Sequence, residues 1–193
     1  MFGISGYART GKDTFGEAMV KVLEKYGIKA KTYALATQLK FDINFLTEGD
    51  FGINAFTKDS EEKKIIRPLL VGYGEAWRRA DPEHWLSIVD SNLEPRTLPI
   101  ITDIRYENEA DYILENQGFL LNLSRCISGD DFVQPANEEE ALNGPKVKDK
   151  SSFLFCWNTT DNQDEIEEIV ESFISSILVQ DGLIDLWTAI YPL

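Results

Sequence analysis

A glycine-rich stretch near the start of the chain constrains its fold more than any other feature. Gly6 is followed by four residues and then by Gly11 and Lys12, which is the pattern G-x-x-x-x-G-K. An apolar run, residues 1–4, precedes it, and a helical pattern follows it. A strand, a glycine loop and a helix start in this order form a cradle in which backbone N–H groups and the helix dipole converge on a phosphate. The motif predicts a phosphate-binding loop, with Lys12 reaching the terminal phosphates of a nucleoside triphosphate.

The residue after the lysine departs from the usual motif. That position normally holds Ser or Thr, whose hydroxyl binds magnesium, whereas here it holds Asp13, with Thr14 behind it. A carboxylate this close to triphosphate oxygens would repel them unless magnesium or water lay between, so Asp13 is a candidate magnesium ligand. The alternative is that Asp13 only complements the positive end of the helix, an effect of about 0.3–1 kcal/mol.

Composition excludes several classes of partner. The 193 residues carry a formal charge of −14, which argues against a nucleic-acid polymer but not against a mononucleotide, because a mononucleotide needs only a few local cations. Cys126 and Cys156 lack metal-binding spacing, and the single histidine, His84, excludes a His-rich site. No segment has the ~20 apolar residues that span a membrane. The first expected strand begins at the initiator Met, so we expect no signal peptide and a cytoplasmic location.

Predicted strands and helices alternate along the chain. The strands are expected at residues 1–4, 28–36, 98–102, 119–123 and 153–157, and the helices at residues 12–26, 37–46, 60–79, 83–92, 108–117 and 163–179. Residues 126–152 are polar and contain Gly and Pro, which favours a mobile loop or lid over core. Strands that alternate with helices behind a phosphate loop predict one α/β domain, a sandwich around a parallel sheet.

Polar residues follow several of the expected strands, at the edge where open α/β sheets bind ligands. Asp103 is placed there as a second magnesium-linked carboxylate, although it could instead cap a turn. Arg105 can clamp a phosphate through two N–H groups, and the alternative is an ion pair with a nearby glutamate. Arg125 is expected to contact the triphosphate or the adenine, and Asn158 to meet the adenine edge.

Cations and tryptophans in the middle of the chain suit an acceptor site. Lys40, Arg67 and Arg79 can bind the phosphate of an acceptor, although ordinary pairing with neighbouring acids on a helix is the alternative. Trp77 and Trp85 can provide a surface on which a base stacks. The alternative for both tryptophans is packing in the core.

Residues 6–14 (GYARTGKDT) resemble the phosphate loop of bacteriophage deoxynucleoside monophosphate kinases, in which Gly-Lys-Asp replaces Gly-Lys-Ser/Thr. Three further stretches are similar to that family: residues 38–40 (QLK), 67–85 (RPLLVGYGEAWRRADPEHW) and 101–111 (ITDIRYENEAD). The second of these contains an Arg, Gly, Arg, Trp series, and the third matches a D-x-R-x-x-N-E element. The resemblance covers about residues 1–175.

The resemblance implies transfer of the ATP γ-phosphoryl group to a deoxynucleoside monophosphate (dNMP) in the presence of Mg2+. It implies a three-layer P-loop NTPase sandwich with a five-stranded parallel sheet, an acceptor region at about 37–92 and a closing lid at about 126–152. The expected partners are small molecules rather than nucleic acids or membranes, and a phage origin would place the protein in the host cell cytoplasm.

The predicted site combines the residues named above. Its catalytic residues are Lys12 and Arg105, and its metal ligands are Asp13 and Asp103. The residues expected to bind ATP are Gly6, Arg9, Gly11, Lys12, Asp13, Thr14, Arg125 and Asn158. The residues expected to bind the acceptor are Lys40, Arg67, Gly74, Trp77, Arg79 and Trp85.

Other functions stay open at this point. Animal-type phosphomevalonate kinases resemble the Gly-Lys-Asp and Asp-x-Arg patterns too, so another small phosphorylated acceptor is the main alternative. A GTPase is disfavoured because no N-K-x-D sequence occurs, and a non-catalytic nucleotide-binding module would lack the acceptor arginines. The sequence leaves open the accepted bases, the preference for deoxyribose, the oligomeric state (a homodimer included) and the role of the apolar tail, residues 181–193.

Overall fold

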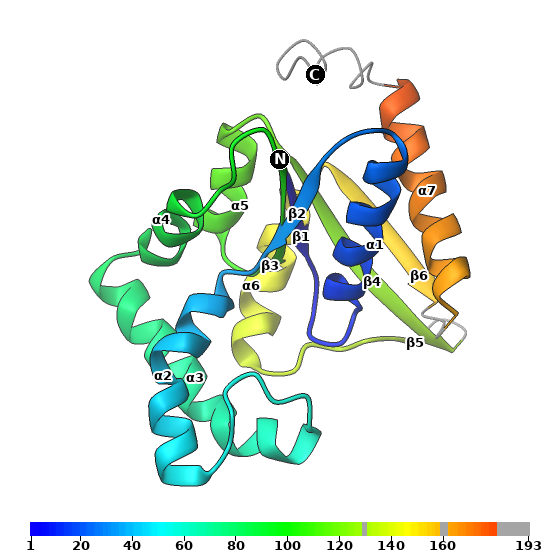
Figure 1. Cartoon of the computed structure of the whole chain (residues 1–193). Helices are drawn as coiled ribbons and strands as arrows, with labels where there is room; N and C mark the ends of the chain where they lie inside the picture. The colour runs from blue at the N-terminus through cyan, green and yellow to red at the C-terminus, as the bar shows by residue number, and fades with distance from the viewer. Residues whose placement is uncertain (129–130, 159–161, 181–193) are drawn as a thin grey trace. The chain divides into compact units, whose positions relative to one another are not determined.

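The computed structural model describes residues 1–128, 131–158 and 162–180, and these divide into two units. The first unit comprises Met1–Thr32 and the described residues from Glu94 onward, and the second comprises Tyr33–Leu93. Figure 1 shows the chain with its helices and strands labelled. The apolar tail at residues 181–193 lies outside the described residues.

A sheet of six strands forms the centre of the first unit, as far as the described residues go. The strands are β1 (Phe2–Ser5), β2 (Ala30–Tyr33), β3 (Leu98–Ile104), β4 (Phe119–Ser128), β5 (Asp131–Phe132) and β6 (Phe153–Asn158). Their order is β2-β3-β1-β4, with β5 and β6 both bound to β4. Strand β1 pairs in parallel with β3 and β4, and β4 pairs in parallel with β6, whereas the two-residue β5 is antiparallel to β4.

Helices cover both faces of this sheet. Helices α1 (Lys12–Lys25) and α7 (Gln163–Gln180) pack together on one face, and α5 (Glu107–Glu115) and α6 (Glu138–Asp149) cover the other (Figure 1). This confirms the expected α/β sandwich with a parallel sheet of five strands, to which β5 is a short antiparallel addition. The arrangement brings the carboxyl ends of β1, β3, β4 and β6 to one edge, where the predicted phosphate loop begins.

Aromatic rings fill the core between the sheet and the α1–α7 face. Phe15 has no exposed surface, and its ring centroid lies 5.4 Å from those of Phe155 and Trp157 and 5.8 Å from that of Phe173. Aliphatic side chains from β1, β4 and α7 surround these rings. Helix α1 is therefore fixed to the sheet immediately behind the loop that precedes it.

Helix α6 occupies residues that the sequence predicts to be a polar loop. Asn137 caps the helix by accepting a hydrogen bond from the Glu140 N–H (2.8 Å), and Val147 is buried against the sheet. Ion pairs then join the last turns to α5, Lys146 to Glu107 (3.1 Å) and Lys150 to Asp111 (2.6 Å).

Gly144 and Pro145 lie inside α6, and because both residues are typical of loops, the sequence did not predict this helix. A parallel connection from β4 to β6 needs a crossover element, and α6 supplies it. The closing role expected of residues 126–152 stays a prediction. Gly129, one of the glycines of that segment, lies outside the described residues.

The second unit is helical and has its own core. It consists of α2 (Ala36–Phe51), α3 (Ser60–Ala80) and α4 (His84–Ser91), with a core that includes Leu39, Ile43, Ile66, Trp85 and Leu86. Its bounds agree closely with the helical region expected at about 37–92. Helix α2 extends beyond residue 46, where the expected helix ends, to Phe51, and it is capped by Gly52, whose φ of 66° is left-handed.

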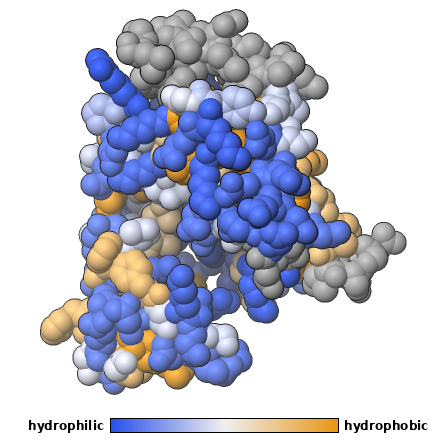
Figure 2. All heavy atoms as spheres, turned by 45° about the vertical axis from the view of Figure 1, so that its right-hand side comes forward, coloured by the Kyte–Doolittle hydropathy of each residue, from blue (hydrophilic) through white to orange (hydrophobic). Residues whose placement is uncertain are grey.

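The molecular surface is mainly hydrophilic on the face that Figure 2 shows. This agrees with the high content of charged residues, 27 % of the chain. Within the described ranges, no helix has both the length and the apolar character needed to cross a membrane.

The core of the first unit provides a stability prediction. We expect Phe15→Ala to lower the free energy of unfolding by about 3–5 kcal/mol, because it leaves a cavity among the three rings that pack against Phe15. Leu154→Ala is the matched control, since Leu154 is on β6 of the same unit but is 64 % exposed, and it should change stability by no more than about 0.5 kcal/mol. Denaturant unfolding followed by circular dichroism compares the two. Equal losses would contradict the packing described for Phe15.

Candidate active site

The loop between β1 and α1 depends on two glycines. Gly6 has a φ of 138°, and a Cβ atom there would lie 2.2 Å from the Leu123 carbonyl oxygen. Gly11 has a φ of 86°, and a Cβ atom there would lie 2.5 Å from the Trp157 ring. Side chains at these positions would both strain the backbone and collide with neighbours. The spacing of the motif is thus the spacing of the two positions that only glycine fits.

Trp157 supports the loop from the end of β6. Its indole Nε1 donates a buried hydrogen bond to the Thr10 carbonyl oxygen (2.8 Å), and its ring lies directly beneath Gly11. The Thr10 hydroxyl donates in turn to the Tyr7 carbonyl oxygen (2.9 Å). Sequence reasoning missed this role of Trp157. The available signal was a tryptophan near the carboxyl end of a strand, the edge at which the phosphate loop lies.

Lys12 is the most buried cation of the loop. Its side chain ends on the carbonyl oxygens of Gly6 (2.9 Å) and Tyr7 (2.8 Å), and the residue is 9 % exposed. Burial, and then the positive charge of Arg105, lower the pKa of Lys12 to about 8, against the opposing effect of nearby carboxylates. The ammonium is therefore charged at neutral pH. An anion brought beside it would stabilise this charge and raise the pKa of Lys12.

The N-terminus of α1 completes the cradle. The first helical hydrogen bond runs from the Phe15 N–H to the Gly11 carbonyl oxygen (2.9 Å), so the N–H groups of residues 12–14 have no partner within the helix. Asp13 and Thr14 are exposed on this first turn. Free amide donors, the helix dipole and the Lys12 ammonium together suit a phosphate.

Two carboxylates lie near Lys12, as the sequence predicts for a magnesium site. Asp13 and Asp103 both act on the Lys12 ammonium and oppose the lowering of its pKa. The buried Thr102 hydroxyl, at the end of β3, donates to Asp13 Oδ1 (3.0 Å) and orients this carboxylate. Among the described residues no group of three or more His, Cys, Asp or Glu could hold a metal ion. Magnesium commonly uses one or two carboxylates with water and substrate phosphates, so the residues present fit it.

Arg105 lies beside the loop, paired with a glutamate that sequence reasoning missed. Its Nη1 is 3.4 Å from Glu140 Oε1. The other Glu140 oxygen accepts hydrogen bonds from the N–H groups of Ala8 (3.1 Å) and Ala136 (3.0 Å). Glu140 is 9 % exposed and joins α6 to the phosphate loop. The sequence signal that could have placed Glu140 at a helix start is the N-x-x-E pattern beginning at Asn137, which is typical of a helix N-terminus.

Glu109, the glutamate of the D-x-R-x-x-N-E element, has a structural role. Its carboxylate, 2 % exposed, accepts hydrogen bonds from the backbone N–H groups of Arg105 (2.7 Å) and Tyr106 (3.1 Å). These bonds fix the turn between β3 and α5. Glu109 therefore sets the backbone from which Arg105 extends.

The structure brings Arg125 to the phosphate loop. Its Nη1 donates to the Arg9 carbonyl oxygen (3.5 Å), and Arg9 is exposed with a left-handed φ of 70°. Asn158, also exposed, ends β6 immediately after Trp157. The first unit thus holds together all the residues predicted for ATP, for magnesium and for catalysis.

The predicted acceptor residues all belong to the second unit, where two have packing roles. Trp85 is 2 % exposed, and its Nε1 donates to the Gly74 carbonyl oxygen (3.4 Å). A Cβ atom at Gly74 would lie 2.8 Å from Leu39, so this glycine permits close packing of α3. Trp77 stacks on His84 with 4.0 Å between ring centroids. Core packing, the alternative that the sequence left open, accounts for Trp85.

The three acceptor cations differ in their surroundings. Lys40 lies over the Phe56 ring (5.7 Å), and Arg79 pairs with Glu75 (3.4 Å). Arg67 is exposed and makes no ion pair with any residue that the structure describes. Arg67 and Arg79 are twelve positions apart on α3, which at about 1.5 Å per residue separates them by about 18 Å. A single phosphate would have to bridge this distance to contact both side chains, and the acceptor role of each arginine stays a prediction.

No protein-family model matches the sequence, and no curated protein matches it. Solved structures with a similar arrangement include a shikimate kinase from Bacteroides thetaiotaomicron, 16 % identical with a TM-score of 0.49, over 91 % of this chain and 97 % of that one. A dephospho-CoA kinase from Campylobacter jejuni is 14 % identical with a TM-score of 0.40, over 91 % and 96 %. A gluconokinase from Sinorhizobium meliloti is 12 % identical with a TM-score of 0.45, over 91 % of each chain. Similarity at this level identifies no substrate for this chain.

The pKa of Lys12 predicts how triphosphate binding depends on pH. A bound triphosphate raises this pKa above its value of about 8 in the free protein, so the favourable contact is complete below pH 8 and is lost as pH rises further. The affinity for ATP should therefore fall above pH 8, by up to about tenfold per pH unit. Titration calorimetry between pH 6.5 and 9.5 measures this, with proton uptake expected near pH 9.

Lys12→Met is the matched control for this pH dependence. It removes the titrating group but keeps a long side chain, and it should bind ATP weakly with no comparable decline above pH 8. A wild-type affinity that stays constant from pH 7 to 9.5 would contradict the lowered pKa.

Proposed function

We propose that this protein is a nucleotide kinase that transfers the γ-phosphoryl group of ATP to a deoxynucleoside 5′-monophosphate, giving a dNDP and ADP. In this reaction an oxygen of the acceptor phosphate forms a bond to the γ-phosphorus, and the bond from that phosphorus to the β–γ bridging oxygen breaks. The acceptor class rests on the Gly-Lys-Asp loop and the D-x-R-x-x-N-E element, both of which resemble those of bacteriophage dNMP kinases.

The observation that carries the proposal is the set of charges gathered around the phosphate loop. Lys12, Arg105 and the N-terminus of α1 supply positive charge, and Asp13 and Asp103 supply the carboxylates. Phosphoryl transfer needs little covalent chemistry from the protein and depends on positioning and on stabilising charge at the transferred group. In a module that only bound nucleotide, Arg105 could serve its ion pair with Glu140 alone, so the acceptor assay below is what distinguishes the two.

Each of these side chains has a definite task in the proposed reaction. The Lys12 ammonium follows negative charge onto the bridging oxygen as the bond to the leaving group breaks. Arg105 offers N–H groups to the transferred or accepting phosphate, since Glu140 engages only its Nη1. Asp13 and Asp103 would hold magnesium, which neutralises phosphate charge when it is bound. Thr102 keeps Asp13 in the required orientation.

The second unit contributes exposed cations to the acceptor in this proposal. Arg67 is the first candidate, because no described residue pairs with it, whereas Arg79 already pairs with Glu75. Lys40 and Trp77 are the further candidates, since each is at least partly exposed.

A panel of acceptors tests the proposal directly. The full chain is incubated with ATP, Mg2+ and each of dAMP, dCMP, dGMP, dTMP and the matching ribonucleotides, and ADP release is measured. We expect at least one dNMP to raise ADP release far above the rate without acceptor. No stimulation by any nucleoside monophosphate would refute the proposed acceptor class, and stimulation by 5-phosphomevalonate would identify the alternative.

Lys12→Ala is expected to leave a folded protein with almost no transfer. The reason is the loss of the ammonium that stabilises charge on the bridging oxygens. Circular dichroism and the melting temperature check the fold, and ADP release checks the activity. The phosphate-loop assignment would fail if a well-folded variant turned over at the normal rate.

Arg67→Ala should act on the acceptor and leave ATP nearly unaffected. Loss of a charged hydrogen bond to phosphate costs about 1.5–3 kcal/mol, so the KM for dNMP should rise roughly ten- to a hundredfold. Arg79→Ala is the matched control on the same helix, and it should leave this KM within about threefold because Arg79 is about 18 Å away. Steady-state kinetics with each substrate varied in turn gives the KM for dNMP and the KM for ATP of both variants. Equal effects on both substrates, or a larger effect of Arg79→Ala, would contradict the assignment.

A further inference from the structure

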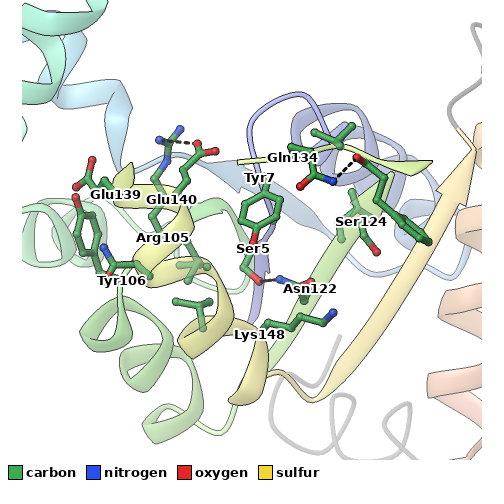
Figure 3. Close-up of a pocket in the computed structure, with 18 of the residues that line it drawn as sticks. Ser5, Tyr7, Arg105, Tyr106, Asn122, Ser124, Gln134, Glu139, Glu140 and Lys148 are labelled. Carbon is green, nitrogen blue, oxygen red and sulfur yellow. Dashed lines mark hydrogen bonds and ion pairs between the residues drawn. The ribbon is translucent and has the colours of Figure 1, made fainter. Parts of the chain in front are cut away.

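A pocket of about 450 Å³ opens in the first unit between the sheet and α6. Residues of β1, β4 and β6 line it, among them Ser5, Asn122, Ser124 and Cys156. In the view of Figure 3, Arg105 is on one side and Gln134 on the other, with Tyr7 of the phosphate loop between them. Its volume is within the range of about 300–1,000 Å³ that is usual for small-molecule sites.

The pocket holds amide groups whose hydrogen-bonding capacity is unused. Asn122 is 8 % exposed and donates to the Ser5 hydroxyl (3.0 Å), but within the described part of the chain nothing donates to its Oδ1. Gln134 uses its Nε2 on the Phe132 carbonyl oxygen (3.0 Å), which leaves its Oε1 without a described partner. The Asn143 amide forms no hydrogen bond with any described residue, although it lines the same space. A buried amide oxygen without a donor points to a ligand that supplies one.

We propose that this pocket binds the base of the acceptor nucleotide, with the acceptor phosphate directed toward Arg105. The inference rests on the proposed kinase function. It assigns the base to the first unit rather than to the tryptophans of the second, which the sequence alone favoured.

The side chains suit a nucleobase. Asn and Gln each present a donor and an acceptor in one plane, and this pattern matches the edge of a base. The ring of Tyr7 provides an aromatic surface, and it is held in place by α6, since a Cβ atom at Gly144 would lie 2.5 Å from it. Apolar contacts come from Ile104, Leu123 and Val133.

The position of Lys12 indicates how the acceptor nucleotide is oriented in the pocket. Its ammonium bonds to the carbonyl oxygens of Gly6 and Tyr7, and both of these residues line the pocket. A terminal phosphate held by Lys12 would therefore lie next to the pocket. Arg105, whose side chain is 44 % exposed, lines the same space and offers its remaining N–H groups there.

Cys156 supplies a test on the unaltered protein. Its exposed thiol lines the pocket, so a bound base should shield it from iodoacetamide. We expect each dNMP that stimulates ADP release to slow alkylation of the Cys156 peptide at least about tenfold at saturation. Neither ATP with Mg2+ nor 2-deoxyribose 5-phosphate, which lacks a base, should slow it more than about twofold. Mass spectrometry of the peptides measures both cysteines separately.

Asn122→Leu is the corresponding variant, because it keeps the volume and removes the amide. It should raise the KM for dNMP about ten- to a hundredfold, change the KM for ATP less than about twofold, and leave the KM for 2-deoxyribose 5-phosphate unchanged. Leu142→Ala is the matched control, since Leu142 is on α6, 66 % exposed and outside the pocket. A structural defect alone would affect all three KM values.

The outcomes separate this inference from the proposed function. If dNMPs stimulate ADP release but neither shield Cys156 nor respond to Asn122→Leu, the base lies elsewhere and the pocket assignment is overturned while the kinase stands. If dNMPs shield Cys156 without stimulating ADP release, the pocket is supported and the kinase is overturned. Shielding by 2-deoxyribose 5-phosphate equal to that by dNMPs overturns the assignment of a base.

Discussion

A buried ammonium needs partners, and the partners of Lys12 organise the binding edge of the sheet. Two carbonyl oxygens of the loop accept its hydrogen bonds, while carboxylates from α1, β3 and α6 surround it. Burial of the charge is unfavourable in the free protein, as the lowered pKa indicates. An incoming phosphate relieves that cost, so the same feature that weakens the empty loop strengthens its complex with an anion. The glycines at 6 and 11 are required because both have positive φ and because a side chain there would meet the Leu123 carbonyl oxygen or the Trp157 ring.

Trp157 and Glu140 connect the loop to the rest of the first unit. Trp157 lies beneath Gly11 and joins the loop to the aromatic core around Phe15. Glu140 joins it to the opposite layer, because one carboxylate accepts from the Ala8 N–H and pairs with Arg105. The loop is thereby fixed from both faces of the sheet. Preorganisation of this kind suits a site that must stabilise charge without rearranging.

The two units divide the predicted residues in a way that bears on function. The residues predicted to bind a triphosphate and magnesium all belong to the first unit, whereas the cations Lys40, Arg67 and Arg79 belong to the second. The second unit also uses Trp85 and Gly74 for its own packing. In the proposed function, Arg105 and the pocket beside Tyr7 would give the first unit an acceptor side of its own. The acceptor is therefore best sought at the phosphate loop first and on α3 second.

Local patterns in the sequence were sufficient for the parallel sheet, the phosphate loop and most helices, because hydrophobic period and glycine spacing are properties of neighbouring residues. Helix α6 was missed since Gly144 and Pro145 obscure its pattern, and contacts with α5 and the sheet stabilise it nevertheless. The sequence also named Lys12 and Asp13 from the glycine motif, and Asp103 and Arg105 from their places beside the end of an expected strand. Only the tertiary structure decided that Glu140 pairs with Arg105, that Thr102 orients Asp13 and that Trp157 supports Gly11. Those contacts join residues from 35 to 147 positions apart, and no local pattern encodes which distant side chain will lie opposite another.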